Sequence, residues 1–151
     1  MFNFFRKPFF SDLEQKELIQ AIQAAEKQTS GEIRLYVEGK NQLDSSVQRA
    51  AVIFEKLQMH KTNERNGVLI YLASRSRQLA VFADEGIYQR LGKEYWEKQA
   101  NEALALAKNN DVKKALVKLI EDIGGILAHE FPYSSETDHN ELSDDIVFGK
   151  K

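Results

Sequence analysis

The sequence has no cysteine among its 151 residues. Disulfide bonds, thiolate nucleophiles and cysteine-based zinc sites are therefore excluded, because each of them needs a thiol. The absence fits a reducing compartment, and we expect a cytoplasmic protein. The sequence also lacks a large excess of charge of either sign, since 21 basic and 23 acidic residues give a net charge of −2. Nucleic-acid-binding domains usually carry a basic stripe, so we expect no nucleic-acid partner.

Long apolar runs are missing as well. No stretch approaches the roughly 20 apolar residues that a membrane-spanning helix needs, so we expect no transmembrane segment. The first residues are aromatic, but Arg6 and Lys7 follow the first apolar side chains and Pro8 interrupts the segment. A signal peptide has its charges first and a continuous apolar stretch after them. We expect residues 1–10 to pack over the core of the domain, with a peripheral membrane or partner contact as the alternative.

The remaining sequence alternates predicted helices and strands. Ser11 and Glu14 form a capping box, and apolar residues at helical spacing follow to about Lys27. Residues 32–38 alternate between polar and aliphatic side chains, which predicts a strand. A second helix is predicted after a cap at Asp44 or Ser45, and its buried stripe consists of Val47, Ala50, Ala51, Phe54 and Leu57. Strands are predicted over 68–73 and 78–83. Helices are predicted over 87–91 and 93–108, and a last helix follows a cap at Asp111.

Two local features refine this picture. Only residues 74–77 separate the second and third strands, which demands a hairpin because a parallel crossover needs a dozen residues or more. Gly124 and Gly125 lie inside the last helix, where each is unfavourable by about 1 kcal/mol relative to alanine. We expect close packing against a neighbour or a kink there.

The chain is predicted to form one α/β domain over residues 11–131. Residues 132–151 are polar and acidic with few apolar side chains, which predicts a flexible tail. Within that tail, residues 146–148 could dock on a surface of this chain or of a partner.

Three segments carry a resemblance to a known family. They are QTSGEIR at 28–34, RNGVLIY at 65–71 and RQLAVFADEGI at 77–87. Their order and spacing resemble the TPM domain family over about residues 11 to 130, and the chain looks like the short, soluble bacterial members. The resemblance implies a central mixed β-sheet that includes a β-hairpin and is flanked by helices on both faces. It also implies binding of divalent metal, calcium included, and an acid-phosphatase activity. The connector at 74–77 lacks the acidic residues that are frequent there in the family.

Three carboxylates are the predicted metal ligands. Glu32 opens the first strand, and Asp84 and Glu85 follow the third. Loops at strand ends form the usual site of an α/β sheet, and carboxylates with loop oxygens suit Ca²⁺ or Mg²⁺. The structural alternative is that Glu32 caps or pairs locally and that Asp84 caps the short helix.

Three further residues could complete such a site. Thr29 and Asn66 can supply neutral oxygens, and Arg65 can bind a phosphate through two parallel hydrogen bonds. The structural alternative for Arg65 is an ion pair with a carboxylate such as Glu32.

Three functions are compatible with these residues and with the resemblance. The first is a metal-binding interaction or adaptor module whose unknown protein partner could be membrane-associated. The second is a metal-dependent acid phosphatase that acts on phosphomonoesters, and the third is a structural interaction domain that binds no ion. Whether the chain is an enzyme stays open at this point, because no Gly-x-Ser-x-Gly elbow or phosphate loop marks a nucleophile or a phosphate site. His60, His129 and His139 do not form a ligand set.

Overall fold

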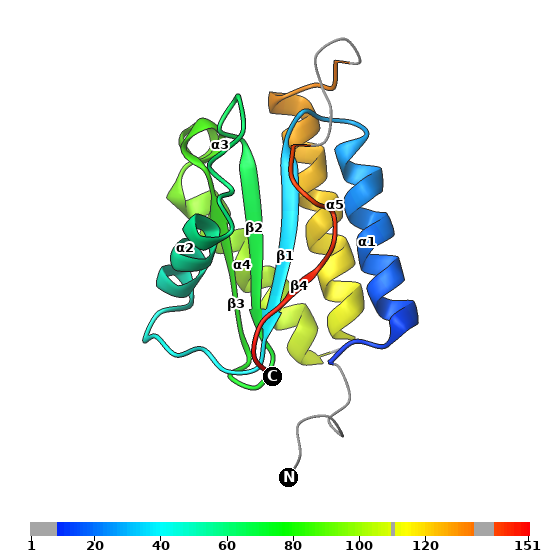
Figure 1. Ribbon diagram of the computed structural model, residues 1–151, viewed down its shortest axis with the longest axis vertical. Helices are drawn as coiled ribbons and strands as arrows, with labels where there is room; N and C mark the ends of the chain where they lie inside the picture. Colours follow the sequence, from blue (N-terminus) through cyan, green and yellow to red (C-terminus); the bar gives the residue numbers. More distant parts are fainter. Residues whose placement is uncertain (1–8, 110, 135–140) are drawn as a thin grey trace.

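The computed structural model describes residues 9–109, 111–134 and 141–151. The elements are α1 (Asp12–Glu26), β1 (Glu32–Glu38), α2 (Ser46–Lys56), β2 (Gly67–Ala73), β3 (Gln78–Ala83), α3 (Glu85–Leu91), α4 (Lys93–Asn109), α5 (Val112–Glu130) and β4 (Val147–Phe148). Their order and bounds follow the predicted pattern closely up to the end of α5 (Figure 1).

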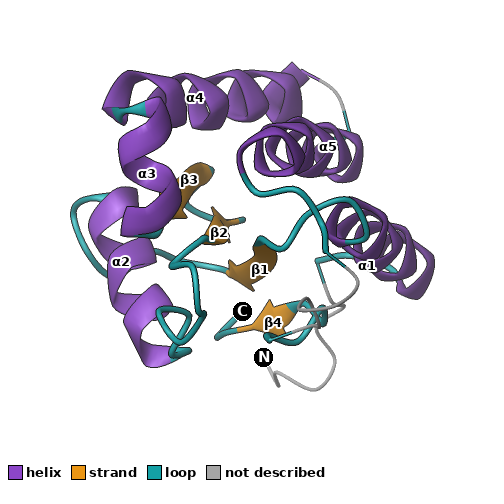
Figure 2. Ribbon diagram, turned by 90° about the horizontal axis from the view of Figure 1, so that it is seen from above, coloured by secondary structure: helices purple, strands orange, loops and turns teal. Residues whose placement is uncertain are grey.

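A four-stranded sheet with the order β3-β2-β1-β4 forms the middle layer. β1 pairs in parallel with both β2 and β4, whereas β2 and β3 form the predicted antiparallel hairpin. Figure 2 shows α2 on one side of the sheet and α1, α4 and α5 on the other. The predicted fold class, a mixed sheet with a hairpin and helices on both faces, is confirmed.

Two hydrophobic clusters fill the spaces between these layers. The larger lies under α1, α4 and α5, and it contains Ile33, Leu35 and Val37 from one face of β1. The smaller lies under α2, which buries Ala50, Ile53 and Phe54. The predicted stripe of α2 is therefore wrong at its start, because the side chain of Val47 in the first turn is 50% exposed.

Helix ends and one glycine also follow the local chemistry. The Ser11–Glu14 capping box is formed, and Asp111 caps α5. A Cβ on Gly124 would lie 2.7 Å from the Cβ of Ala25 in α1. The glycine therefore permits the close approach of α1 and α5 that its position predicted.

Both ends of the described chain pack on the domain. Phe10 is 1% exposed and belongs to the larger cluster, as expected for an aromatic segment covering the core, whereas Phe9 is 45% exposed. The rest of the predicted segment, residues 1–8, lies outside the described residues.

The C-terminal segment differs from the flexible tail that composition predicts. Residues 141–151 run along the edge of β1 and contribute β4, with Ile146 packed against the core (Figure 1). The physical reason is that backbone groups on a strand edge hydrogen-bond an extended segment whatever its side chains are. The docking of residues 146–148 on a surface of this chain agrees with the sequence analysis, and residues 135–140 lie outside the described part.

Candidate functional site

The predicted metal ligands share one end of the sheet. β1 and β2 are parallel, so Glu32 lies beside Gly67, and the antiparallel β3 brings Asp84 to the other side of the same residue. The amide of Asp84 donates to the Gly67 carbonyl at 2.9 Å. β2 nevertheless separates the two carboxylates by two strand spacings, which is about 10 Å along the sheet.

Asp84 and Glu85 are held by Arg65. Nε and Nη2 of Arg65 donate to the two oxygens of Asp84 at 2.7 and 2.9 Å, and Nη1 lies 2.8 Å from Glu85. Asp84 also caps α3 by accepting from the amide of Glu85. These contacts match the structural alternative for Asp84, and the ion pair of Arg65 forms with Asp84 and Glu85 instead of Glu32.

The backbone around this ion pair is tightly fitted. Arg65 has a φ of 51°, which is uncommon for a residue other than glycine. Its carbonyl accepts from the amide of Gly86 at 2.8 Å, and a Cβ on Gly86 would lie 2.5 Å from that same oxygen. The glycine is therefore needed for α3 to start against this loop.

Glu32 is engaged by the C-terminal segment. Its Oε1 accepts from the backbone amides of Glu141 and Leu142, the second at 2.8 Å. The carboxylate is buried, with 3% of the residue exposed. Glu32 therefore fixes the start of the docked segment, which a metal ligand at the same oxygen could not do.

Thr29 and Asn66 serve the local structure. The Thr29 hydroxyl donates to the carbonyls of Leu127 and Phe131, and accepts from the amide of Gly31 at 3.0 Å. The Asn66 side-chain nitrogen donates to Ser30 at 3.2 Å. Asn66 Oδ1 is buried and has no hydrogen-bond partner among the residues that the structure describes, so of the two predicted neutral ligands it is the one with an open acceptor there.

Further carboxylates crowd around Glu32. Glu26, at the end of α1, accepts from the amide of Ile33 at 2.7 Å and hydrogen-bonds the side chain of Asp144. Burial, followed by the Asp144 contact, raises the pKa of Glu26 to about 10. Burial likewise raises the pKa of Glu32 to about 7, although the Leu142 and Glu141 amides act in the opposite direction. The C-terminal segment is therefore attached at a place where ionisation of Glu26 and Glu32 is unfavourable.

The expected metal residues do not fit a metal ion in this arrangement. Both oxygens of Asp84 are taken by Arg65, and Oε1 of Glu32 is taken by two amides. Over residues 9–109, 111–134 and 141–151, no group of three or more His, Asp or Glu side chains is placed to hold a metal. Binding by Glu32, Asp84 and Glu85 therefore stays a prediction that requires these contacts to open.

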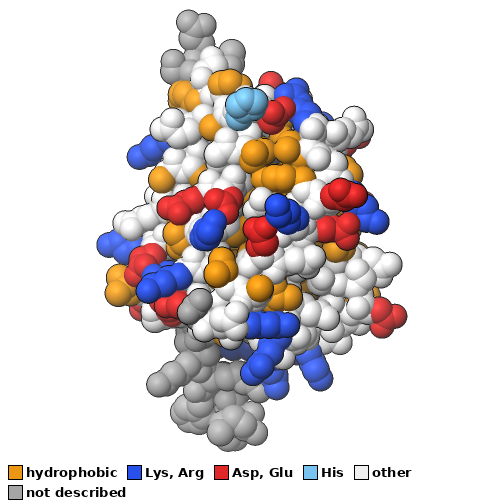
Figure 3. Space-filling model, turned by 180° about the vertical axis from the view of Figure 1, so that it is seen from behind, with side chains coloured by type: hydrophobic (Ala, Val, Ile, Leu, Met, Phe, Trp, Pro, Cys, Tyr) orange, Lys and Arg blue, Asp and Glu red, His pale blue; other side chains and the backbone are white. Residues whose placement is uncertain are grey.

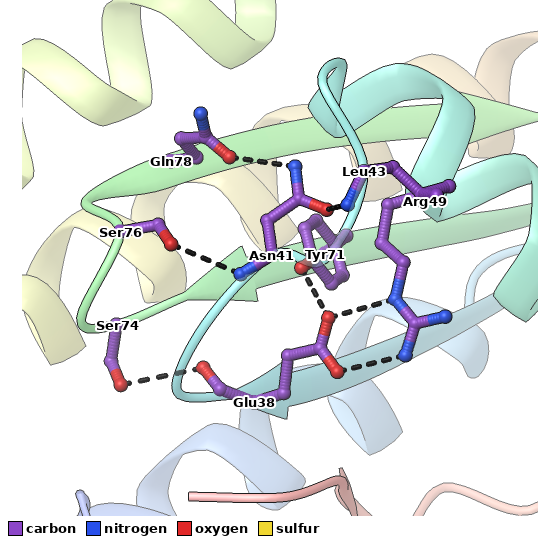
Figure 4. Close-up of polar contacts among 8 residues, drawn as sticks. All are labelled: Glu38, Asn41, Leu43, Arg49, Tyr71, Ser74, Ser76 and Gln78. Carbon is purple, nitrogen blue, oxygen red and sulfur yellow. Dashed lines mark hydrogen bonds and ion pairs between the residues drawn. The ribbon is translucent and has the colours of Figure 1, made fainter.

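The opposite end of the sheet carries a buried polar network. At the end of β1, both oxygens of Glu38 accept from Arg49 of α2 at 2.8 and 2.9 Å, and Glu38 also accepts from the hydroxyl of Tyr71 (Figure 4). Burial alone would raise the pKa of Glu38, but the hydrogen bonds from Arg49 and Tyr71 outweigh it and the pKa is lowered. Glu38 therefore stays ionised at neutral pH.

The loop that follows β1 is fixed to the hairpin. The backbone amide of Asn41 donates to the Ser76 hydroxyl at 3.0 Å, and its side-chain nitrogen donates to Gln78 at 2.8 Å (Figure 4). A cavity of about 530 Å³ opens beside this loop, at the carboxyl ends of β1 and β2. In open α/β sheets, ligands bind outside the carboxyl ends of the parallel strands. The structure therefore places the better-formed hollow at the end opposite to the predicted residues.

Sequence analysis missed Glu26, Glu38 and Arg49, and it expected docking only for residues 146–148 of the C-terminal segment. The alternation of residues 32–38 places Glu38 on the same face as Glu32 and Tyr36, which was an available signal. Nothing local pairs Glu38 with Arg49, because their contact depends on how α2 packs on the sheet.

Known proteins and structures give a consistent assignment. The sequence model of the TPM domain matches residues 6–126. The NMR structure of BA42 from the psychrophilic bacterium Bizionia argentinensis is similar with 35% identity and a TM-score of 0.86, covering 95% of this chain and 97% of that one. No curated protein gives a significant match.

Two more distant structures share the fold alone, each with 13% identity. The N-terminal domain of cg2496 from Corynebacterium glutamicum has a TM-score of 0.64, with 89% of this chain and 85% of that one covered. The N-terminal domain of a P. gingivalis protein has a TM-score of 0.62, with 87% and 82% covered. None of the helices in the described part of the chain is long and apolar enough to cross a membrane. On the family match and the likeness to BA42, the chain belongs to the TPM domain family.

Proposed function

We propose that this chain is an interaction module whose binding surface is the outer edge of β1. One observation carries the proposal: an extended segment of the chain itself, residues 141–151, already occupies that edge. Strand addition to a sheet edge is a recurring mode of peptide recognition, in which main-chain hydrogen bonds supply affinity. The partner that fits is an extended peptide segment of another protein.

The hydrogen bonds along the edge are those that a bound peptide would use. The amide of Gly149 donates to the carbonyl of Val37 at 2.7 Å, and the amide of Gly39 donates to the carbonyl of Lys150 at 2.7 Å. At the other end, Glu32 receives the two amides of residues 141 and 142. These contacts involve the backbone of the segment, so the hydrogen bonds themselves do not depend on its side chains. Position 149 is the exception to free sequence choice, because a Cβ there would collide with the hydroxyl of Tyr36.

The native segment is held weakly enough to be replaced. β4 contains two residues, and the side chain of Phe148 is 44% exposed. The attachment also brings Asp144 against Glu26 near Glu32, which opposes docking when these groups ionise. A partner strand that pairs over more of the seven residues of β1, without these acids, would bind more tightly.

The metal-binding and membrane parts of the expected function stay predictions. Support for cation binding is limited to the crowded acids near Glu32 and the open acceptor of Asn66. The expected ligands would first have to exchange Arg65 and the C-terminal segment for the ion. The acid-phosphatase alternative gains no support from the site, because Asp84 and Arg65, which would hold metal and phosphate, are paired with each other.

A strand-exchange experiment tests the proposal. A protease site is placed within residues 135–140, the intact chain is purified and cleaved, and a fluorescent peptide with the sequence of residues 141–151 is added in excess. We expect the labelled peptide to replace the cleaved segment, so that its fluorescence elutes with the protein in gel filtration. The matched control is the peptide with Gly149→Pro, which lacks the N–H that donates to Val37.

The outcomes are distinct. Exchange of the labelled peptide, and failure of the proline peptide to exchange, support the edge as a binding surface. If no exchange occurs at millimolar peptide, or if the proline peptide exchanges equally well, the edge is a fixed part of the fold and the proposal fails.

A further inference from the structure

Two hollows lie next to each other at the carboxyl ends of the parallel strands. The cavity of about 530 Å³ is lined from β1, from the start of α1, from the loop after β2 and from residues 148–151. A second hollow of about 310 Å³ lies between the hairpin and helices α4 and α5. Phe9 and Ser74 line both, so the two hollows adjoin. Ligand sites typically have volumes of about 300–1,000 Å³.

The walls of the two adjoining hollows are mainly apolar. They are formed by the side chains of Phe9, Val37, Phe148, Leu72, Leu104 and Val112. Phe9 is 45% exposed between the two parts, where its ring contacts that of Phe10. Water gains few hydrogen bonds against such walls, so an aliphatic chain would be favoured over it.

The rim of the hollow is basic. Arg75 lines the first part, and Arg77 and Lys108 line the second. All three are exposed, and none takes part in a salt bridge within the described ranges. Nη1 of Arg75 donates at 3.3 Å to the main-chain oxygen of Lys151, the last residue, so a terminal carboxylate lies beside this guanidinium. Figure 3 shows Lys and Arg side chains gathered at this lower end of the molecule.

Negative charge in the lining is already neutralised. Glu38 is the one acidic side chain that these described residues contribute to either hollow, and both of its oxygens accept from Arg49. A ligand with an anionic head would therefore meet Arg77 and Lys108, which form no salt bridge with a described residue, together with the remaining donors of Arg75 at the rim and apolar side chains inside. Arginine is suited to this role because its planar donors match carboxylate and phosphate oxygens.

We propose that this hollow binds a single-chain anionic amphiphile, such as a fatty acid, with the chain between Phe9, Val37 and Phe148 and the head group on Arg75 and Arg77. The binding site goes beyond the proposed strand-edge function and does not depend on it. β4 supplies Phe148 and Gly149 to the wall, so the ligand would bind the form in which the C-terminal segment is docked.

Four probes of the intact chain test the proposal. Sodium dodecanoate, dodecyl maltoside, dodecyltrimethylammonium and acetate are titrated below their aggregation concentrations, and backbone amide shifts are followed by NMR. We expect dodecanoate alone to bind, with saturable shifts at residues 9, 37–39, 74–77 and 148–149. Arg75→Gln combined with Arg77→Gln should weaken dodecanoate about tenfold, as expected for the loss of two partly exposed ion pairs. Lys56→Gln combined with Lys61→Gln removes the same charge elsewhere and should leave binding unchanged.

The other outcomes overturn the proposal. Equal binding of dodecyl maltoside would show a hydrophobic surface without charge selectivity, and binding of acetate alone would show an anion site. If dodecanoate binds only after residues 1–8 are deleted, the occupant is this chain's own N-terminus. If phosphatidylglycerol vesicles bind and free dodecanoate does not, the surface recognises a membrane.

Discussion

Replacing Arg49 by methionine should destabilise the fold by about 3–5 kcal/mol, because it leaves a buried carboxylate without its cation. Arg49 donates to both oxygens of Glu38 at 2.8 and 2.9 Å, and the Glu38 side chain is 4% exposed. Methionine keeps much of the apolar stem that Arg49 packs at 18% exposure, so most of the loss reports the charge. Domains of this kind have a total stability of about 5–15 kcal/mol, so the effect is large enough to measure.

The loss should depend on pH in a defined direction. In the native chain the pKa of Glu38 is lowered, because the hydrogen bonds from Arg49 and Tyr71 outweigh burial. A carboxyl with a lowered folded-state pKa contributes stability above its unfolded pKa of about 4.5 and loses it as the pH falls through the folded value. Without Arg49, burial should instead raise the pKa of Glu38. The two proteins should therefore differ most near pH 7 and converge only as the pH falls below about 4.5, through the lowered pKa of Glu38 in the native chain.

Urea unfolding followed by circular dichroism between these pH values measures the effect. The double variant Arg49→Met with Glu38→Gln removes both charges and should recover much of the loss, since removing a whole buried pair is far less costly than breaking it. Lys61→Met, which removes an exposed cation from the loop after α2, is the matched control and should change stability by less than about 0.5 kcal/mol. A loss under about 1 kcal/mol for Arg49→Met, or a double variant no more stable than the single one, would refute the electrostatic argument.

Three further predictions test other parts of the structure. Gly124→Ala should destabilise the fold by about 1–3 kcal/mol in urea unfolding, because its Cβ would press on α1 at 2.7 Å, whereas Gly125→Ala meets nothing within 4 Å and should be neutral or stabilising. Hydrogen exchange should show the C-terminal segment loosening as the pH rises from about 5 to 8, because the pKa of Glu32 is raised to about 7 and its proton is lost in that window. Glu32→Gln should remove this pH dependence, and a native segment whose protection does not change with pH would contradict the prediction. If Glu32, Asp84 and Glu85 bind metal, millimolar Ca²⁺ or Mg²⁺ should shift the backbone amide NMR signals near Glu32 and Asp84. The same titration of Asp84→Asn should give no shift. The absence of a shift in the native chain would refute the metal hypothesis.

Local chemistry made much of the fold predictable. The capping box at Ser11, the cap at Asp111 and the short connection between β2 and β3 each act over a few residues, so the pattern of side chains suffices to place them. The alternation of β1 identified its buried face for the same reason, because residues two apart point to the same side of a strand.

The predicted site was only partly accessible in this way. Strand directions bring Glu32 and Asp84 to one end of the sheet, as the prediction required, but their hydrogen-bond partners come from distant segments. Arg65 lies 19 residues from Asp84, and the amide of Leu142 lies 110 residues from Glu32. Composition gave no indication of these contacts, because a carboxylate has the same sequence signal whether it is open to an ion or already paired.

By itself, the sequence determined the helices, the strands, the hairpin and the family, since these rest on short-range periodicity and on ordered motifs. Only the tertiary structure decided that an acidic C-terminal segment closes the edge of β1, that Glu38 is neutralised by Arg49, and that the cavity lies at the carboxyl ends of the parallel strands. The physical reason is that backbone edges, buried charge pairs and cavities are properties of surfaces brought together by folding. No single stretch of chain contains them.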